Sequence, residues 1–417
     1  MKVLFIHPFL PYPLTSGGHQ ALFNGLMAVK GDVEITLVYA AVDNEAHQQA
    51  QKEFMRLMPN VVLCPLLQKL PLPPTKEELI RGKVRNIYRK WFHIKDKELP
   101  SSYDSSKGWK RTITPDDKEW IEHIYNVSHS QQYDIIQIEM PWRISDIYAM
   151  PKEPKIIFVH HELGFVRREL EMQNIENNLY LQVCKKFVDM NEFMQLNLYD
   201  AIITLSSTDK HKLEGNGVSV PIYSSFATIQ VRKERLPYKG DGKHLVFVGP
   251  EIHKPNYVGV SWFLENCWSK LRERDSAYTL DIIGNWTPAR VKEFGQKYAN
   301  VNFLGYVDDL YAAIKDCIMI VPITIGSGIR MKILEACSMG IPFVSTTVGA
   351  EGIPIKDSKQ CLIADDAERF VENIARLQDP ILCDTLCRSS FEMVKEFYSV
   401  AALRDNRLGI YRDLFVK

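Results

Sequence analysis

The sequence predicts an α/β protein made of two doubly wound parallel-sheet domains, and three observations lead to this prediction. Short apolar runs alternate with longer amphipathic segments along all 417 residues, a pattern typical of βα units rather than of sandwiches or bundles. The length exceeds the roughly 250–300 residues at which a single hydrophobic core stops growing. A polar stretch without hydrophobic periodicity, residues 230–242, separates two similar βα series and is interpreted as a linker.

The first series opens with a buried strand. We expect its strands at 3–7, 33–39, 135–138, 155–159, 201–205 and 221–224, and its clearest helices at 18–30 and 167–198. The apolar N-terminus meets Pro8, Pro11 and Pro13 and has no small-residue cleavage site, so we interpret it as a strand rather than a secretion signal. We therefore expect a cytoplasmic protein, free in the cytoplasm or at the inner face of the membrane, whose eight cysteines are reduced and mostly packed in cores.

One segment, residues 70–118, does not fit a minimal βα unit. It is rich in proline at its start and then basic from Lys76 to Lys97, with Tyr88, Trp91 and Phe92 interleaved. Two interpretations remain open. The segment is a solvated helical insertion, or it contacts an anionic lipid surface or an anionic acceptor.

The second series repeats the pattern after the linker. We expect its strands at 245–248, 279–283, 301–304, 318–322 and 342–345, and its helices at 256–274, 289–299, 308–315 and 328–339. The acidic pairs at 308–309 and 365–366 are interpreted as helix starts, where carboxylates are favourable.

The most informative motif joins the strand at 318–322 to the helix at 328–339. Gly326 and Gly328 allow a tight turn with positive φ, and Ser327 between them is a plausible N-cap. The helix is expected to stop at Gly340, two residues before Pro342. A glycine turn that leads into a helix N-terminus is a site for an anion, because free N–H groups and the helix dipole both face it.

Charged residues follow this turn. Arg330 and Lys332 fall in the first turn of the predicted helix, where cations are unfavourable unless an anion lies between them. Glu335 lies one turn further on. It can accept hydrogen bonds from a ribose, or it can form an ion pair with Lys332 at i, i+3.

Two other places are candidates for ligand contacts. His160 and His161 follow the strand at 155–159, and ligands of open α/β sheets bind beyond the carboxyl ends of strands. Either histidine can instead be satisfied by the loop backbone. Gly17 and Gly18 precede the first helix and form a second anion-friendly turn, or only a strand-to-helix turn.

Composition and missing motifs exclude several classes of protein. Lys plus Arg and Asp plus Glu both number 51, so the chain lacks the net positive charge of a dedicated nucleic-acid binder. No P-loop, no Gly-x-Gly-x-x-Gly and no Gly-x-Ser-x-Gly occurs, which argues against P-loop NTPases, ordinary dehydrogenases and α/β-hydrolases. No Cys/His cluster has zinc spacing.

Four stretches together resemble one family. Residues 321–353, 246–256, 199–206 and 11–18 are similar, in that order, to the donor-site signature, the opening of the C-terminal domain, the last N-terminal strand and the N-terminal glycine loop of GT-B glycosyltransferases of the retaining group 1 (family 4) type. The resemblance covers nearly the whole chain. It implies two facing Rossmann-like domains: an acceptor domain at 1–235, a nucleotide-sugar donor domain at 236–398, and a last helix at 399–417 that returns to the first domain.

The resemblance also implies roles for residues. The donor diphosphate would contact Arg330, Lys332 and the backbone at Gly249, Ser327, Gly328 and Ile329, while Glu335 would bind ribose and Gly17 and Gly18 would face the donor. His161, followed by Glu162 as in the family pattern, would lie near the transferred sugar. His161, Arg330 and Lys332 are thus the expected catalytic residues, with no metal and no required cofactor. No Asp-x-Asp motif occurs, which disfavours the metal-dependent GT-A class.

Two departures from the family pattern affect this assignment. The family often has two glutamates eight residues apart at the donor site; Glu335 fits the second position, but Ser327 occupies the first. The family commonly has an arginine in the turn after Gly249, and this chain has none there. We therefore expect Arg330 and Lys332 to supply the positive charge instead.

The resemblance implies a retaining transferase that moves a hexose from a nucleotide-diphosphate sugar, UDP rather than GDP, to a glycan or lipid-linked acceptor in surface polysaccharide synthesis. A GT-B nucleotide-sugar epimerase or phosphorylase, and a non-catalytic GT-B subunit that binds nucleotide-sugar or a partner, remain as alternatives. The expected partners are the donor and the acceptor, together with peripheral membrane contact through the Lys76–Lys97 segment, and no nucleic acid.

Overall fold

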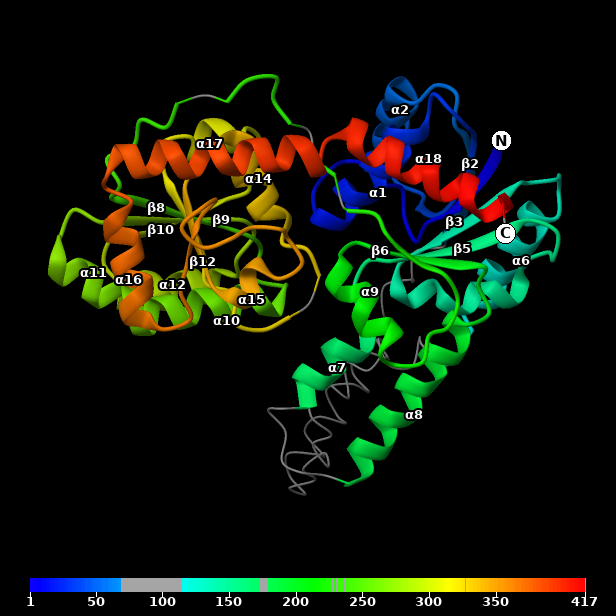
Figure 1. The fold of residues 1–417 in the computed structure, drawn as a ribbon, viewed down its shortest axis with the longest axis horizontal. Helices are drawn as coiled ribbons and strands as arrows, with labels where there is room; N and C mark the ends of the chain where they lie inside the picture. The colour runs from blue at the N-terminus through cyan, green and yellow to red at the C-terminus, as the bar shows by residue number, and fades with distance from the viewer. Residues whose placement is uncertain are drawn as a thin grey trace, which may run out of the picture.

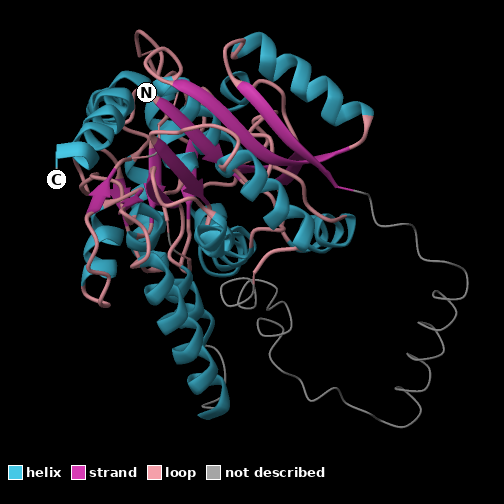
Figure 2. Ribbon diagram, turned by 90° about the vertical axis from the view of Figure 1, so that its right-hand side faces the viewer, coloured by secondary structure: helices cyan, strands magenta, loops and turns pink. Residues whose placement is uncertain are grey.

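A computed structural model describes residues 1–68, 115–172, 179–226, 228–229, 231–235, 237–326 and 328–416. The described chain contains two parallel sheets with helices on both faces (Figures 1 and 2). The predicted basic segment from Lys76 to Lys97 and residue Ser327 lie outside the described residues.

The first sheet has seven strands in the order β3-β2-β1-β4-β5-β6-β7, all parallel. They are β1 (Lys2–Ile6), β2 (Glu34–Val42), β3 (Val62–Gln68), β4 (Ile135–Glu139), β5 (Lys155–His160), β6 (Ala201–Thr204) and β7 (Ile222–Ser224). Its helices are α1 (Gly17–Val29), α2 (Glu45–Leu57), α6 (Lys118–Ser128), the 3₁₀ segment η1 (Pro141–Ala149), α7 (Gly164–Met172), α8 (Leu179–Leu196) and α9 (Ser207–Glu214).

The second sheet has six strands in the order β10-β9-β8-β11-β12-β13, also parallel. They are β8 (His244–Val248), β9 (Thr279–Ile283), β10 (Val301–Gly305), β11 (Ile318–Val321), β12 (Phe343–Ser345) and β13 (Leu362–Ile363). Its helices are α10 (Lys254–Phe263), the π segment η2 (Leu264–Trp268), α11 (Ser269–Arg274), α12 (Pro288–Lys297), α13 (Leu310–Ile314), α14 (Met331–Met339), α15 (Thr347–Ala350), α16 (Ala367–Arg376) and α17 (Pro380–Phe397).

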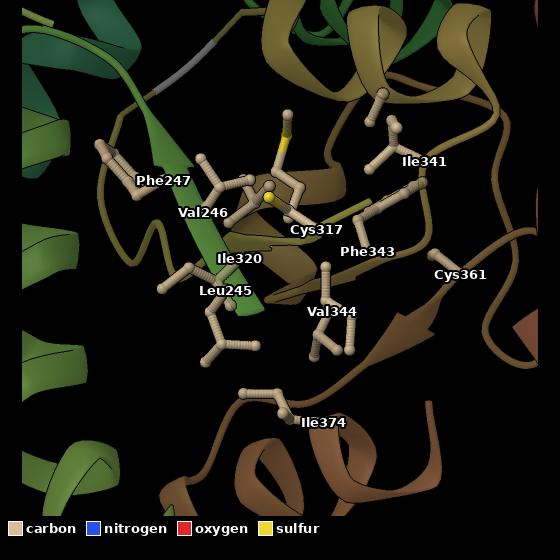
Figure 3. Close-up of a cluster of buried hydrophobic side chains, with 14 of the residues drawn as sticks. Leu245, Val246, Phe247, Cys317, Ile320, Ile341, Phe343, Val344, Cys361 and Ile374 are labelled. Carbon is tan, nitrogen blue, oxygen red and sulfur yellow. The ribbon is translucent and has the colours of Figure 1, made fainter. Parts of the chain in front are cut away.

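Both sheets reverse their strand order between the first and fourth strands in sequence, which is the doubly wound arrangement that the sequence predicts. In the second sheet, side chains such as Val246, Ile320 and Val344 are fully buried between the helix layers (Figure 3). Such continuous burial explains why these strands are apolar runs rather than alternating ones.

The last helix, α18 (Val400–Val416), continues from α17 and crosses onto the first domain (Figure 1). Its residues Leu403, Ile410, Tyr411 and Leu414 belong to the same buried cluster as the strands of the first sheet. Arg404 Nε donates to Asp32 Oδ2 at 2.7 Å at the edge of this contact. The predicted return of the C-terminal helix is confirmed.

Two strands were not predicted, and one predicted helix is wrong. β3 was not predicted, because Pro65 interrupts it and because it is an edge strand with exposed Val62 and Leu67. β13 is too short to give a pattern. The single helix predicted at 167–198 is two helices, α7 and α8. Residues 173–178 between them are not among the described residues.

Other predictions are confirmed in detail. Asp309 and Asp366 cap α13 and α16 through their side chains, as the acidic pairs suggest. All eight cysteines are free thiols, and six of them are buried. Within the described ranges, no helix combines the length and the apolar character needed to cross a bilayer.

Candidate active site

The loop between β11 and α14 reaches from the second domain toward the first. Gly326 (φ 108°) and Gly328 (φ 83°) adopt conformations that favour glycine. Because Gly328 is left-handed, it cannot belong to the helix, and α14 begins at Met331 with Arg330 as its N-cap. The predicted helix start at residue 328, with its cap at residue 327, is therefore wrong by three residues.

Arg330 is 7% exposed, and its Nη1 donates to the carbonyl of Gly328 at 2.6 Å. The guanidinium thereby holds the glycine loop in its turn. Burial lowers the pKa of Arg330, while the nearby carboxylates of Glu351, Glu162 and Asp209 act to raise it.

Lys332 is a second cation in the same place. Its Nζ donates to Asn256 Oδ1 at 2.8 Å and lies 3.9 Å from the centroid of the Phe247 ring. Burial, and then repulsion by Arg330, lower the pKa of Lys332 to about 7. Arg330 is buried and Lys332 is partly buried beside it. Because Arg330 disfavours the charged form of Lys332, an anion such as a diphosphate would stabilise the charges of this site.

The turn after β8 forms the other side of this site. Gly249 (φ 151°) packs so closely on Asn256 that an added methyl group would lie 2.5 Å from Asn256 Nδ2. Asn256 in turn donates to the carbonyl of Pro250 at 2.9 Å. Burial, then Lys332 and Arg330, lower the pKa of His253 in this turn to about 4, so the ring is neutral at pH 7.

The first helix of the N-terminal domain meets α14 directly. Gln20 Nε2 donates to Glu335 Oε1 at 3.0 Å across the two domains. Burial raises the pKa of Glu335, against the hydrogen bond from Gln20. The charge of Lys332 also acts to lower the pKa of Glu335, and Glu335 acts to raise that of Lys332, so the pairing of these two residues stays a prediction.

The predicted glycines of the first domain lie in the first turn of α1. A methyl group added at Gly17 would lie 3.0 Å from Met331 Cγ, and one at Gly18 would lie 3.5 Å from Met140 Cε. Gly17 thus allows α1 to approach α14. Ile329 packs against the buried clusters of both domains.

His161 lies at the carboxyl end of β5, next to the glycine loop. A methyl group added at Gly328 would lie 3.3 Å from the His161 carbonyl oxygen. The His161 ring is held by Glu139, with 2.7 Å between Nε2 and Oε2. Its neighbour His160 is buried elsewhere, with its Nε2 3.2 Å from Glu192 Oε1, so the structure brings His161 and not His160 to the loop.

Four residues of the site were not predicted from the sequence: Gln20, Glu139, Asn256 and His253. Glu139 had a usable signal, because it ends a buried strand beside the strands that lead to His7 and His161. Asn256 and His253 fall within the stretch 246–256 that resembles the family, but they belong to no motif of their own. No three His, Cys, Asp or Glu side chains of the described ranges are grouped so that they could hold a metal ion.

Comparison with known proteins identifies the second domain. Residues 242–379 match the family model of the group 1 glycosyl transferases. The whole chain is similar in fold to TarM (TM-score 0.70, 10% identity, 98% of each chain) and to sucrose-phosphate synthase of Thermosynechococcus elongatus (TM-score 0.69, 15% identity, 100% of this chain and 99% of that one). The chain is a glycosyltransferase with the GT-B fold.

Two further relatives of this GT-B glycosyltransferase bear on its context. HepE of Anabaena, solved in complex with UDP, has a TM-score of 0.66 at 11% identity over 99% of this chain and 100% of its own. An uncharacterized 44.6 kDa protein in the cps region of Klebsiella pneumoniae is 22% identical over 95% of this chain and 96% of its own.

Proposed function

We propose that the GT-B glycosyltransferase transfers a hexose from a UDP-sugar with retention of anomeric configuration, as the family 4 resemblance implies. The observation that carries the proposal is the pair of basic residues at the N-terminus of α14, the buried Arg330 and the partly buried Lys332. Charge develops on the diphosphate as the bond to the sugar breaks, and preorganised cations in a dry site stabilise it strongly.

The other site residues are assigned around this diphosphate. The backbone N–H groups of Ser327, Gly328 and Ile329 and the turn at Gly249 would bind its oxygens, and Glu335 would accept from the ribose hydroxyls. Gly17 and Gly18 would line the site from α1. Uridine as the base is supported by HepE, which has been solved with UDP and with UDP-glucose.

His161 would lie beside the transferred sugar. It directly follows β5 and lies next to the glycine loop, and its ring is held by the buried carboxylate of Glu139. The reaction would then be a front-face displacement in which the departing phosphate receives the proton of the acceptor hydroxyl. The C–O bond to the acceptor forms on the face from which the C–O bond to the phosphate breaks, and no cofactor is required.

The acceptor would be a glycan or a lipid-linked precursor in surface polysaccharide synthesis. The Klebsiella relative from a cps region supports this context. Contact with the membrane through the Lys76–Lys97 segment remains a prediction.

The exposed face of α8 supports a lipid-linked acceptor. Phe187, Met190 and Met194 are each more than half exposed, on one side of this helix. The two acids of the helix, Asp189 and Glu192, are instead buried in ion pairs with Arg168. An apolar surface without exposed acids suits an anionic lipid surface.

Vesicle sedimentation tests this part of the proposal. The chain should sediment with vesicles that contain phosphatidylglycerol, and the triple variant F187S/M190S/M194S should not. Ile381→Ser removes a similarly exposed apolar side chain, 78% exposed on α17, and should bind like the wild type. If the triple variant sediments as much as the wild type, α8 does not contribute to membrane contact.

Nucleotide binding tests the donor site. Thermal stabilisation by UDP, but not by GDP, ADP or CMP, and unchanged by EDTA, is the expected result. Arg330→Ala and Lys332→Ala should each reduce turnover about 100-fold with folding retained. Arg274→Ala, on an exposed cation of the same domain, is the control. Release of UDP only when an acceptor is added would distinguish a transferase from an epimerase.

A further inference from the structure

A continuous set of buried hydrogen bonds links the C-terminal helix to His161. Arg407 Nη1 and Tyr411 Oη, both on α18, donate to Gln137 Oε1 at 3.0 and 2.6 Å. Gln137 Nε2 then donates to Glu139 Oε1, and Glu139 Oε2 contacts His161 Nε2 at 2.7 Å. Residues of β4, β5 and α18, far apart in the sequence, thus form one chain of contacts.

The direction of every bond in this chain follows from Arg407. A guanidinium only donates hydrogen bonds, so the atom of Gln137 that faces Arg407 must be the amide oxygen. The amide nitrogen of Gln137 must then face Glu139 and donate to it. The phenol of Tyr411 uses the second lone pair of the same oxygen.

Glu139 is an ionised acceptor at the centre of the chain. It is 4% exposed, and burial acts to raise its pKa. The hydrogen bond with His161, together with the nearby ring of His7, outweighs burial and holds the pKa of Glu139 well below its usual range. His7 is fully buried at the end of β1, with its Nε2 3.4 Å from Glu139 Oε1. The groups that face this carboxylate are therefore Gln137 in β4, His7 directly after β1 and His161 directly after β5.

We propose that Glu139 is a positioning residue for the transfer reaction: it fixes the His161 proton on Nε2 and leaves Nδ1 as a hydrogen-bond acceptor for a sugar hydroxyl. An ionised carboxylate can only accept, so a neutral imidazole in contact with it must donate from Nε2. The role of His161 toward the sugar rests on the proposed function. The assignment of the tautomer does not.

The substitution Glu139→Gln should reverse the tautomer. Arg407 and Tyr411 keep Gln137 oriented as a donor, so the new amide must turn its oxygen toward Gln137. Its NH₂ group then faces His161, and the imidazole must accept at Nε2 and carry its proton on Nδ1. The same ring in the same place would present a donor where it previously presented an acceptor.

Long-range ¹H–¹⁵N NMR of the histidine rings in the full-length protein tests this inference without any activity. The wild-type His161 should be the Nε2–H tautomer, and E139Q should show Nδ1–H. Glu192→Gln, which alters the carboxylate paired with the neighbouring His160, should leave His161 unchanged. A wild-type Nδ1–H tautomer, or one tautomer in both wild type and E139Q, would overturn the proposal.

Kinetics separate this inference from the proposed function. In E139Q, kcat for transfer should fall about 10- to 100-fold while the Kd for UDP is unchanged, and Glu139→Asp, which keeps the acceptor character, should restore part of the loss. If the tautomers behave as expected but no transfer is found for the wild type, the proposed function fails and the positioning role of Glu139 stands. If E139Q does not fold, the tautomer of wild-type His161 alone tests the proposal: Nε2–H supports it and Nδ1–H overturns it.

Discussion

Gln20 and Glu335 join the two domains through a hydrogen bond of 3.0 Å between side chains separated by 315 residues. Gln20 lies in the first turns of α1, and Glu335 lies in the middle of α14. The carboxylate that the sequence assigns to a ribose is therefore already in contact with the opposite domain. As the proposed ribose ligand, Glu335 would therefore respond both to the nucleotide and to the contact between the domains.

Glu335→Gln should weaken UDP binding about 10-fold, because a neutral amide replaces the charged acceptor for the ribose hydroxyls. Isothermal titration calorimetry measures this directly. The comparison variant is Gln20→Ala, which removes the interdomain bond but not the carboxylate and should change UDP affinity by less than about 3-fold. Equal losses in the two variants would mean that Glu335 acts through domain contact rather than through the ribose.

Lys332 should take up a proton when UDP binds. With a pKa of about 7 in the free protein, the amine is largely neutral at pH 8, and a diphosphate beside it favours the charged form. Titrations in buffers with different ionisation enthalpies should show uptake of up to about one proton at pH 8. Lys332→Met should abolish the uptake, and Lys292→Met, on an exposed lysine of α12, should not.

The same pKa predicts how stability depends on pH. The pKa of Lys332 is lower in the folded chain than the usual 10.5 of an unfolded one, so between about pH 7 and 10.5 the folded state binds fewer protons. The contribution of Lys332 to stability should therefore rise with pH across this window and be constant below it. Urea denaturation of wild type and Lys332→Met at pH 7 and 9 checks the sign: the variant should gain most at pH 7.

The sequence was sufficient to predict two doubly wound domains and the glycine loop before α14, although it did not predict β3 and β13. Buried parallel strands are apolar runs, and the glycine loop before α14 is visible as a motif. The start of α14 was misplaced because glycine and serine are good residues for both a loop and a helix start. Only the backbone angles of Gly328 and Arg330 separate these cases.

The environment of His161 could be predicted only in part. Its place after a strand follows from the hydrophobic pattern, and the preference for His161 over His160 follows from the family resemblance. Its bond to Glu139 depends on the register of β4 against β5, and the support from Arg407 depends on how α18 seats on the sheet. Such contacts between residues 22 and 270 positions apart leave no local signal in a single sequence.

Gly328→Ala should damage both stability and activity. The residue has φ 83°, and its new methyl group would lie 3.3 Å from the His161 carbonyl. We expect a loss of about 1 kcal/mol in the free energy of unfolding and at least about a 10-fold loss in turnover, because the loop must move away from His161. Gly305→Ala is the matched control: it has φ 69° but open space around the new methyl group. It should lose similar stability and keep its activity, and equal activity in both variants would contradict the role given to the loop.

Tyr411→Phe should lower the free energy of unfolding by about 1 kcal/mol, because it removes a buried hydroxyl that donates to Gln137 at 2.6 Å. Tyr398 supplies the matched control. Its hydroxyl is also buried, but it has no hydrogen-bond partner within the described part of the chain, so Tyr398→Phe should be neutral or stabilising. Urea denaturation of both variants measures the difference. A neutral Tyr411→Phe would show that α18 is held on the first domain by its apolar contacts and the Arg404–Asp32 pair, and that the hydrogen bonds to Gln137 orient the site without stabilising the fold.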